Sequence, residues 1–369
     1  MTPPPARTAT DQSRRAEDFD PTRHLAFTPI RFGTHFSLPW HRRKAVVLTA
    51  LIVALAVAVV AALTTGRTSI SATDVLATLT GHGRETTEAI LWNIRLPRVV
   101  TGVVVGAALA ASGGVFQSMS GNALGSPDII GFTSGAAAGA VVLIVIFGAG
   151  PLVVSAGAML GGLLAALVVY ALSFRGGAAG GYRVILVGIG VGALLRAVTT
   201  IVLTQYDADI ALAGHAWLTG TLNARTWTQA AMAAVAVIVL LPVLLAVARH
   251  LNTAELGDDL ATQLGVPVQV SRVVTVAAGV GLVGAATAAA GPISFIALAA
   301  PHLTRRMVGV AEVPVVTAAV TGSLLVVAAD LLGQRLPQVL QMPIGLTSGV
   351  LGGVYLLWLL SRPSRSVTT

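Results

Sequence analysis

Ten apolar stretches, each long enough to cross a lipid bilayer, make up most of this 369-residue chain. A hydrocarbon core of about 30 Å needs roughly 20 residues of helix, because each residue adds about 1.5 Å. The sequence therefore predicts an all-α polytopic membrane protein. We expect about ten transmembrane helices, near residues 45–63, 97–119, 129–148, 151–174, 184–203, 228–247, 271–290, 292–308, 314–332 and 343–361.

The composition excludes a water-soluble domain. Hydrophobic residues make up 55% of the chain and charged residues 10%, and the mean hydropathy is +0.83. The net charge of +8 could suggest a nucleic-acid partner, but the Lys and Arg residues stand at the ends of the apolar stretches. This placement predicts contact with lipid headgroups and no nucleic acid. The chain has no cysteine, which excludes thiolate metal sites and cysteine nucleophiles.

The distribution of Lys and Arg also predicts the topology. These residues favour one set of alternating loops, which should face the cytoplasm. Both termini then lie in the cytoplasm, and the protein is a multi-pass protein of the plasma membrane. Residues 1–44 are polar and Pro-rich and predict a disordered N-terminal tail. The transmembrane domain spans 45–361, and 362–369 form a short C-terminal tail.

The sequence contains no nucleotide-binding loop. Lys44 is the only lysine and lies at the first membrane boundary, so a glycine-rich phosphate loop ending in Lys-Ser or Lys-Thr is absent. The chain is therefore not itself an ATPase, and we expect a transport subunit that does no covalent chemistry. If its transport uses ATP, a separate subunit must dock on the cytoplasmic face.

One predicted cytoplasmic loop, 249–272, is long enough for such docking. Its capping residues predict two short helices, one from Asn252 or Thr253 to Gly257 and another from Asp258 to Gly265. Leu256, Ala261 and Leu264 give these helices an apolar face. Two interpretations stay open, namely that this face binds another protein or that it folds back on its own bundle.

A single charge lies well inside a predicted span. Arg196 stands in the fifth apolar stretch, where a charge costs about 2.5–3.5 kcal/mol or more. We expect it to meet an anionic cargo or a carboxylate of a partner. The alternative is that it reaches toward the surface or bonds helix carbonyls.

Four motifs follow one another in a fixed order. They are RLPRVVTGVVVGAALAASGGVFQ (95–117) continued by NALGSPDIIGFTSGA (122–136), the 249–272 loop with its two Leu-Gly pairs, GPISFIALAAPHLTRRMVG (291–309), and the segment from Asp330 through Pro343 and Gly345. Together they resemble the FecCD-type permease family of bacterial ABC importers, which carry ferric siderophores, haem or cobalamin. The resemblance covers about residues 45–361.

The resemblance implies a type II ABC importer permease fold and a set of partners. A second permease subunit would complete a dimer, two nucleotide-binding subunits would hold ATP and Mg, and a substrate-binding protein would deliver cargo from outside. The chain itself would bind no cofactor or metal. Arg196 repeated across a twofold axis would face its own charge, which slightly favours a heterodimer. The cargo most often carried in this family is a ferric siderophore.

The resemblance also assigns candidate sites. The binding protein would dock on Arg95, Arg98 and Arg335. The ATPase would meet the coupling loop at Leu256, Gly257, Ala261, Leu264 and Gly265, and the translocation pathway would include Gln117, Asn122, Arg196, Thr199 and Thr200.

Several positions depart from the family pattern. Asn122-Ala123 replaces Asn-Pro, Ala297 replaces a common Gly, and Gln341 replaces a frequent Glu. Arg335 lies five residues after Asp330 instead of four, which makes its docking role less secure. We expect Asp330 and Arg335 to form an ordinary salt bridge. His302 has no second ligand at useful spacing, so we expect a structural hydrogen bond there instead of a metal site.

Two other functions compete with ATP-driven import. An ion-coupled secondary transporter would need no motor, but it would show paired intramembrane carboxylates or broken helices meeting at the midplane. Alternatively, the chain could complete a dimer whose active pathway lies in a paralogous subunit. Deleting each subunit in a transport assay would separate that possibility from equal participation.

Overall fold

The computed structural model describes most of the chain. The described residues are 28–32, 36–40, 42–66, 68–122, 125–127, 131–175, 178–179, 181–310, 312–336 and 342–361. Most of the predicted N-terminal tail, the predicted C-terminal tail and Gln341 lie outside these ranges.

Helices form nearly all of the described structure. In chain order they are α2 (Arg42–Thr64), α3 (Ala72–Leu79), α4 (Glu85–Ile90), the π-helical turn η1 (Leu91–Arg95), α5 (Leu96–Ser120), α6 (Phe132–Val145), α7 (Pro151–Ser173), α8 (Gly181–Gln205), α9 (Ala208–Leu218), α10 (Trp227–Ala254), α11 (Asp258–Gln263), α12 (Val268–Ala290), α13 (Ile296–Val308), α14 (Val315–Arg335) and α15 (Ile344–Ser361). Two short antiparallel pairs, β1 (Thr28–Phe32) with β2 (Phe36–Trp40) and β3 (Phe174–Arg175) with β4 (Ala178–Ala179), complete it.

Each predicted span coincides with a helix, and the prediction of an all-α membrane protein is confirmed. Among the described residues, seven helices are long and apolar enough to cross a membrane. The other three predicted spans are shorter helices, α6, α13 and α15. Helix α13 begins only after the irregular segment 291–295, because Gly291 and Phe295 both have positive φ angles. The sequence pattern had placed this segment inside the span.

Three regions differ from the predicted arrangement. The strands β1 and β2 give regular structure to part of the tail that was predicted to be disordered. Helix α10 continues to Ala254, so the first of the two short helices predicted in the 249–272 loop is the end of α10. Helices α3, α4 and α9 were not predicted, because each is too short to produce a clear apolar period.

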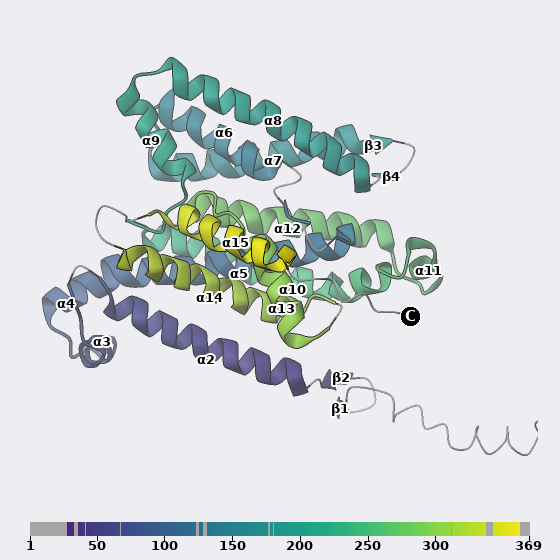
Figure 1. Ribbon diagram of the computed structural model, residues 1–369, viewed down its shortest axis with the longest axis horizontal. Helices are drawn as coiled ribbons and strands as arrows, with labels where there is room; N and C mark the ends of the chain where they lie inside the picture. The colour runs from purple at the N-terminus through teal and green to yellow at the C-terminus, as the bar shows by residue number, and fades with distance from the viewer. Residues whose placement is uncertain are drawn as a thin grey trace, which may run out of the picture.

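Helix α5 lies in the middle of the bundle (Figure 1). Helices α10, α12, α13 and α14 all pack on it, whereas α6, α7, α8 and α9 form a group on one side and α2 lies on the other. Figure 1 also shows α3 and α4 at one end of the bundle and α11 at the other. We call the first the Arg98 end, after a residue in the first turn of α5, and the second the α11 end.

Small residues let the central helices touch through their backbones. A side chain at Gly106 of α5 would overlap the carbonyl oxygen of Gly322 in α14. In the same way, a side chain at Gly113 would overlap the carbonyl oxygen of Ala297 in α13. Close backbone approach of this kind is the main packing device in lipid, where burial of apolar surface drives little association between helices. It makes α5, α13 and α14 one rigid unit.

Candidate functional site

A cavity of about 640 Å³ opens at the Arg98 end. The end of α2, the turn η1, the start of α5, the segment 221–223, the end of α14 and the start of α15 form its walls. Its lining residues include Arg95, Arg98, Asn223, Asp330 and Gln334. The concave shape and the charged lining identify it as a candidate binding site.

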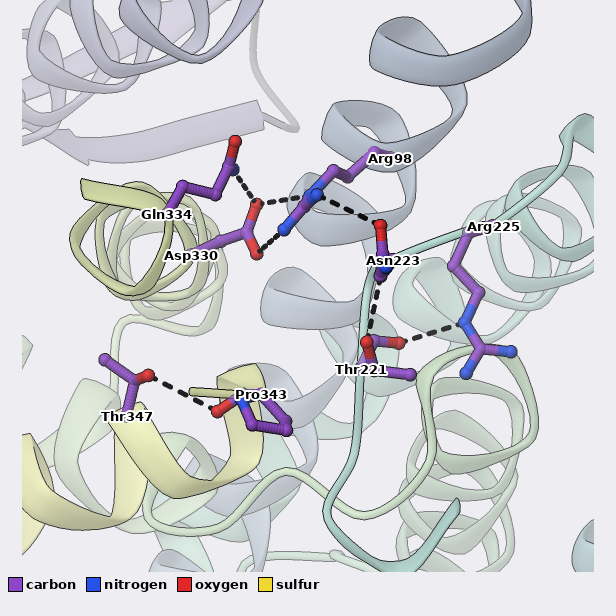
Figure 2. Close-up of polar contacts among 8 residues, drawn as sticks. All are labelled: Arg98, Thr221, Asn223, Arg225, Asp330, Gln334, Pro343 and Thr347. Atoms are coloured by element: carbon purple, nitrogen blue, oxygen red, sulfur yellow. Dashed lines mark hydrogen bonds and ion pairs between the residues drawn. The ribbon is translucent and has the colours of Figure 1, made fainter. Parts of the chain in front are cut away.

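Arg98 forms the main contact across this cavity (Figure 2). Its Nε donates to Oδ2 of Asp330 at 2.9 Å, and its Nη2 donates to Oδ1 at 2.8 Å. Gln334 donates to the same carboxylate at 2.8 Å. The predicted salt bridge between Asp330 and Arg335 is wrong, because the fold brings α5 beside α14 and supplies a closer cation. Arg335 instead donates to Oγ1 of Thr65 at 3.3 Å.

Arg95 is buried and turned toward the backbone of the preceding loop. Its Nη1 and Nη2 donate to the carbonyl oxygens of Leu63 and Thr68. The turn η1 sets this direction, since Leu96 N–H bonds Leu91 O, five residues back. Pro97 lacks an N–H, which favours such a wider turn. Arg95 therefore holds the end of α2 against α5.

Two residues that contact the pair formed by Arg98 and Asp330 were not predicted from the sequence. Asn223 Oδ1 lies 3.4 Å from Nη1 of Arg98, and Gln334 supports Asp330. Gln334 could have been found, because it stands one turn after an aspartate in an apolar helix. Asn223 lies in an irregular segment far away in sequence, and no local pattern could have placed it at the cavity.

The segment that carries Asn223 is fixed by backbone contacts. Thr221 N–H donates to Ala290 O at 2.7 Å, and Arg225 Nε donates to Thr221 O at 2.9 Å (Figure 2). Burial lowers the pKa of Arg225 from its ordinary value. Gly345 at the start of α15 passes close to Thr219 O and Pro292 O. Three backbone segments, at Thr219, Pro292 and Gly345, thus meet next to the cavity wall.

At the α11 end, a short helix stands between two glycines. Gly257 has a φ angle of +109° and Gly265 has one of +82°. Ala261 is fully buried against the bundle, whereas Leu256 is 66% exposed and Leu264 is 62% exposed. Of the three residues predicted to form one apolar face, only Ala261 folds back on the bundle. The leucines remain an apolar surface without a partner in the described chain.

Polar contacts join this end to the bundle. Arg272 of α12 forms a bidentate ion pair with Asp258, in which Nη1 donates to Oδ2 at 2.9 Å and Nη2 donates to Oδ1 at 2.8 Å. Asn252 near the end of α10 donates to Glu312, in the α13–α14 loop, at 2.6 Å. His250 Nδ1 lies 3.0 Å from Ser271 Oγ. These contacts would therefore transmit a movement of the α10–α11 segment to α12 and to the α13–α14 loop.

The predicted pathway residues fall into two groups. Arg196 is exposed in the middle of α8, where its Nη1 donates to Ser134 Oγ at 3.2 Å and its carbonyl accepts from Thr200 at 3.0 Å. Thr199 is buried and donates to Leu195 O at 2.9 Å. Of the three predicted pathway residues in α8, Arg196 and Thr200 are exposed in the single chain and Thr199 is buried.

Gln117 lies in a packed interface. It is 1% exposed, and its Nε2 donates to Leu298 O at 3.0 Å, which links α5 to α13. Arg305 Nη2 reaches its Oε1 at 3.4 Å, while Arg305 Nε is buried without a partner. Asn122 is exposed beyond the end of α5.

His302 makes the structural hydrogen bond that was expected. Its Nδ1 lies 2.7 Å from the hydroxyl of Tyr355, which joins α13 to α15. Among the described residues, no group of three or more His, Cys, Asp or Glu side chains could hold a metal ion.

Comparison with known families decides the classification. The sequence model of the FecCD transport family matches residues 52–362. The chain belongs to this family. Like other FecCD proteins, it is a multi-pass membrane permease.

Curated relatives support this assignment over nearly their whole length. The chain is 40% identical to the ferric enterobactin transport system permease protein FepG of Escherichia coli (strain K12), over 88% of this chain and 98% of that protein. It is 38% identical to the achromobactin transport system permease protein CbrC of Dickeya dadantii (strain 3937), over 85% and 90%. Permeases named for cobalamin and hemin transport also match.

A solved structure described as an inward-facing conformation of a putative metal-chelate type ABC transporter has the same fold. Its TM-score is 0.77 at 26% identity, and the match covers 86% of this chain and 99% of that one. The prediction of a type II ABC importer permease fold is confirmed.

Proposed function

We propose that this FecCD protein is the permease subunit of an ATP-driven importer that moves a ferric siderophore across the plasma membrane. The observation that carries the proposal is the end-to-end similarity to permeases named for ferric enterobactin and achromobactin. The geometry fits an importer, because one end of the bundle offers a charged cavity and the other an exposed pair of leucines beside α11. The permease performs no covalent chemistry.

The motor would dock at the α11 end. Leu256 and Leu264 flank α11, each directly before a glycine with a positive φ angle, and covering an exposed leucine pair with a partner lowers the free energy. Two nucleotide-binding subunits would bind ATP and Mg, and this chain would bind neither. Closure of these subunits would push α11 and, through Asn252 and Glu312, the bundle. Both termini would then lie in the cytoplasm.

The binding protein would dock at the Arg98 end. Arg95, Arg98 and Arg335 all lie at this end, as the family pattern implies, although only Arg95 and Arg98 line the cavity. Guanidinium groups at a membrane surface bind carboxylates of a partner through two parallel hydrogen bonds. Delivery at this end and ATP-driven closure at the other would expose the pathway to one side at a time.

The pathway would pass along the outward face of α8, at the dimer interface. An exposed guanidinium at mid-membrane requires an anion or water, and Ser134 alone leaves most donors of Arg196 unused. We therefore place Arg196 and Thr200 against the second permease, with a heterodimer slightly favoured. Arg196→Leu should reduce uptake with little effect on the amount of folded protein. Unchanged uptake by a folded variant would remove Arg196 from the pathway.

Uptake in cells tests the proposed function directly. Radioactive ferric siderophore, haem and cobalamin are offered to cells that lack this chain and to cells in which it is restored. We expect restoration to recover siderophore uptake, and inactivation of the partner ATPase to abolish it. Recovery of haem or cobalamin uptake instead would change the cargo but keep the mechanism. Recovery that survives loss of the ATPase would support an ion-coupled secondary transporter.

A further inference from the structure

The guanidinium of Arg98 has one edge occupied and one edge open. Arginine carries five N–H donors in a planar fork. Asp330 takes the edge formed by Nε and Nη2, at 2.9 and 2.8 Å. The other edge, formed by Nη1 and Nη2, meets only Asn223 Oδ1 at 3.4 Å, which is longer than a normal N–H···O bond of about 2.7–3.2 Å. Donors on this edge remain for a ligand.

The occupied edge holds the guanidinium in place. Gln334 Nε2 donates to Asp330 Oδ2 at 2.8 Å from the next turn of α14, so the carboxylate is fixed from two directions (Figure 2). The two helices beneath it cannot separate easily, because Gly106 and Gly322 bring their backbones into contact. Arg98 therefore lies on a rigid base while its side chain stays 22% exposed toward the cavity.

The other two arginines predicted to dock the binding protein, Arg95 and Arg335, lack such an arrangement. Both Nη atoms of Arg95 donate to the backbone carbonyls of Leu63 and Thr68. A side chain at Gly66 would come within 2.7 Å of Arg95 Nη2, so the loop backbone covers that group. Arg335 is exposed and lies outside the cavity lining. The open, positioned donor edge in this cavity belongs to Arg98.

We propose that Asp330 with Gln334 is a positioning pair, which holds Arg98 so that its open edge, with Asn223 beside it, faces the binding-protein carboxylate that the proposed function assigns to it. The inference rests on the proposed function and adds the residues that orient one of its docking arginines. Asp330 acts through Arg98 and does not itself touch the partner.

The test uses the complete transporter, purified with its ATPase subunits in lipid nanodiscs. The cargo-loaded binding protein is titrated, and its half-saturating concentration for stimulation of ATP hydrolysis is measured. We expect Asp330→Asn to raise this concentration about tenfold, which corresponds to about 1.4 kcal/mol. Arg98→Gln should raise it at least as much, and Asp330→Glu should restore most of the loss. The yield of assembled transporter and the maximal stimulated rate are measured alongside, because a merely structural defect lowers both, whereas weakened docking raises the half-saturating concentration alone.

The double variant separates positioning from direct contact. If Asp330 acts only through Arg98, the Arg98→Gln/Asp330→Asn protein should match Arg98→Gln alone. Gln334→Leu removes only the second support and should raise the half-saturating concentration about threefold, which keeps the test available if Asp330→Asn fails to assemble.

Three results would overturn the inference. A lower half-saturating concentration for Asp330→Asn would mean that Asp330 competes with the partner for Arg98. An unchanged concentration would mean that Asp330 has no part in docking. Additive losses in the double variant would mean that Asp330 acts independently of Arg98. In all three cases the wild-type transporter still responds to its binding protein and imports cargo, so the proposed function stands. Absence of both wild-type responses would overturn the proposed function together with the inference.

Discussion

The two ends of the bundle differ in how their side chains are paired. At the Arg98 end, polar groups from segments far apart in sequence satisfy one another, as in the contact between Arg98 and Asp330. At the α11 end, the ion pair between Arg272 and Asp258 is local, and two leucines project without a partner. The Arg98 end is a polar surface whose groups hold one another in place, whereas the α11 end exposes a leucine pair that no other part of the described chain covers.

The largest expected effect comes from placing charges on the exposed leucine pair at the α11 end. Leu256→Asp with Leu264→Asp should abolish uptake and weaken copurification of the ATPase at least about 100-fold, because each leucine contributes about 1.5–3 kcal/mol when covered. Pull-down with the partner ATPase measures this directly. Leu76→Asp, on the exposed face of α3 at the other end, is the matched control and should leave copurification intact. Normal copurification of the double variant would exclude α11 as the docking surface.

The next effect distinguishes a structural arginine from a docking one. Arg95→Leu removes the donor to the carbonyl oxygens of Leu63 and Thr68, and the buried Leu63 group alone should cost about 1–3 kcal/mol. Thermal unfolding in detergent should therefore occur at a clearly lower temperature, and Arg95→Lys should recover part of the loss. In the same assay Arg98→Gln should unfold closer to the wild type, since Arg98 is partly solvated. The reverse order of stability would contradict the assignment of Arg95.

A smaller effect tests the glycine that precedes α11. Gly257 has φ and ψ angles of +109° and 146°, a region that residues with side chains rarely enter. Gly257→Ala should cost about 1–3 kcal/mol from backbone strain alone, because an added Cβ meets no atom within 4 Å. Uptake should fall while the amount of folded permease changes little. Gly190→Ala, which also meets no atom and has no positive φ, should be neutral. Equal behaviour of the two variants would rule out a conformational role for Gly257.

The smallest effect belongs to the exposed ion pair at the α11 end. Asp258→Asn removes the partner of Arg272, and such surface pairs contribute only about 0–1 kcal/mol. We expect stability and uptake to remain near the wild-type values at physiological salt. If Asp258→Asn lowered uptake as much as Asp330→Asn does, the exposed ion pair at the α11 end would matter as much as the half-buried one at the Arg98 end.

The sequence predicted the class and the elements better than the contacts. All ten apolar stretches became helices, because apolar length is a local property. The short helix expected between Asn252 and Gly257 did not form, since α10 simply continued past the apolar stretch. Capping residues can end a helix, but they do not oblige it to end. The pairing of Asp330 was also predicted from proximity in sequence, and the fold supplied a different arginine.

The sequence by itself determined that this chain spans a membrane, that it contains no ATP-binding loop, and which family motifs it carries. These conclusions depend on hydropathy, on a missing residue pattern and on local order, and none of them needs a contact. Only the tertiary structure decided that Arg95 donates to backbone carbonyls and that Arg98 pairs with Asp330, which Gln334 supports. It also decided that Gln117 lies in a packed interface. A side chain's partner depends on which helices meet, and in lipid that is set by where glycines allow backbones to touch.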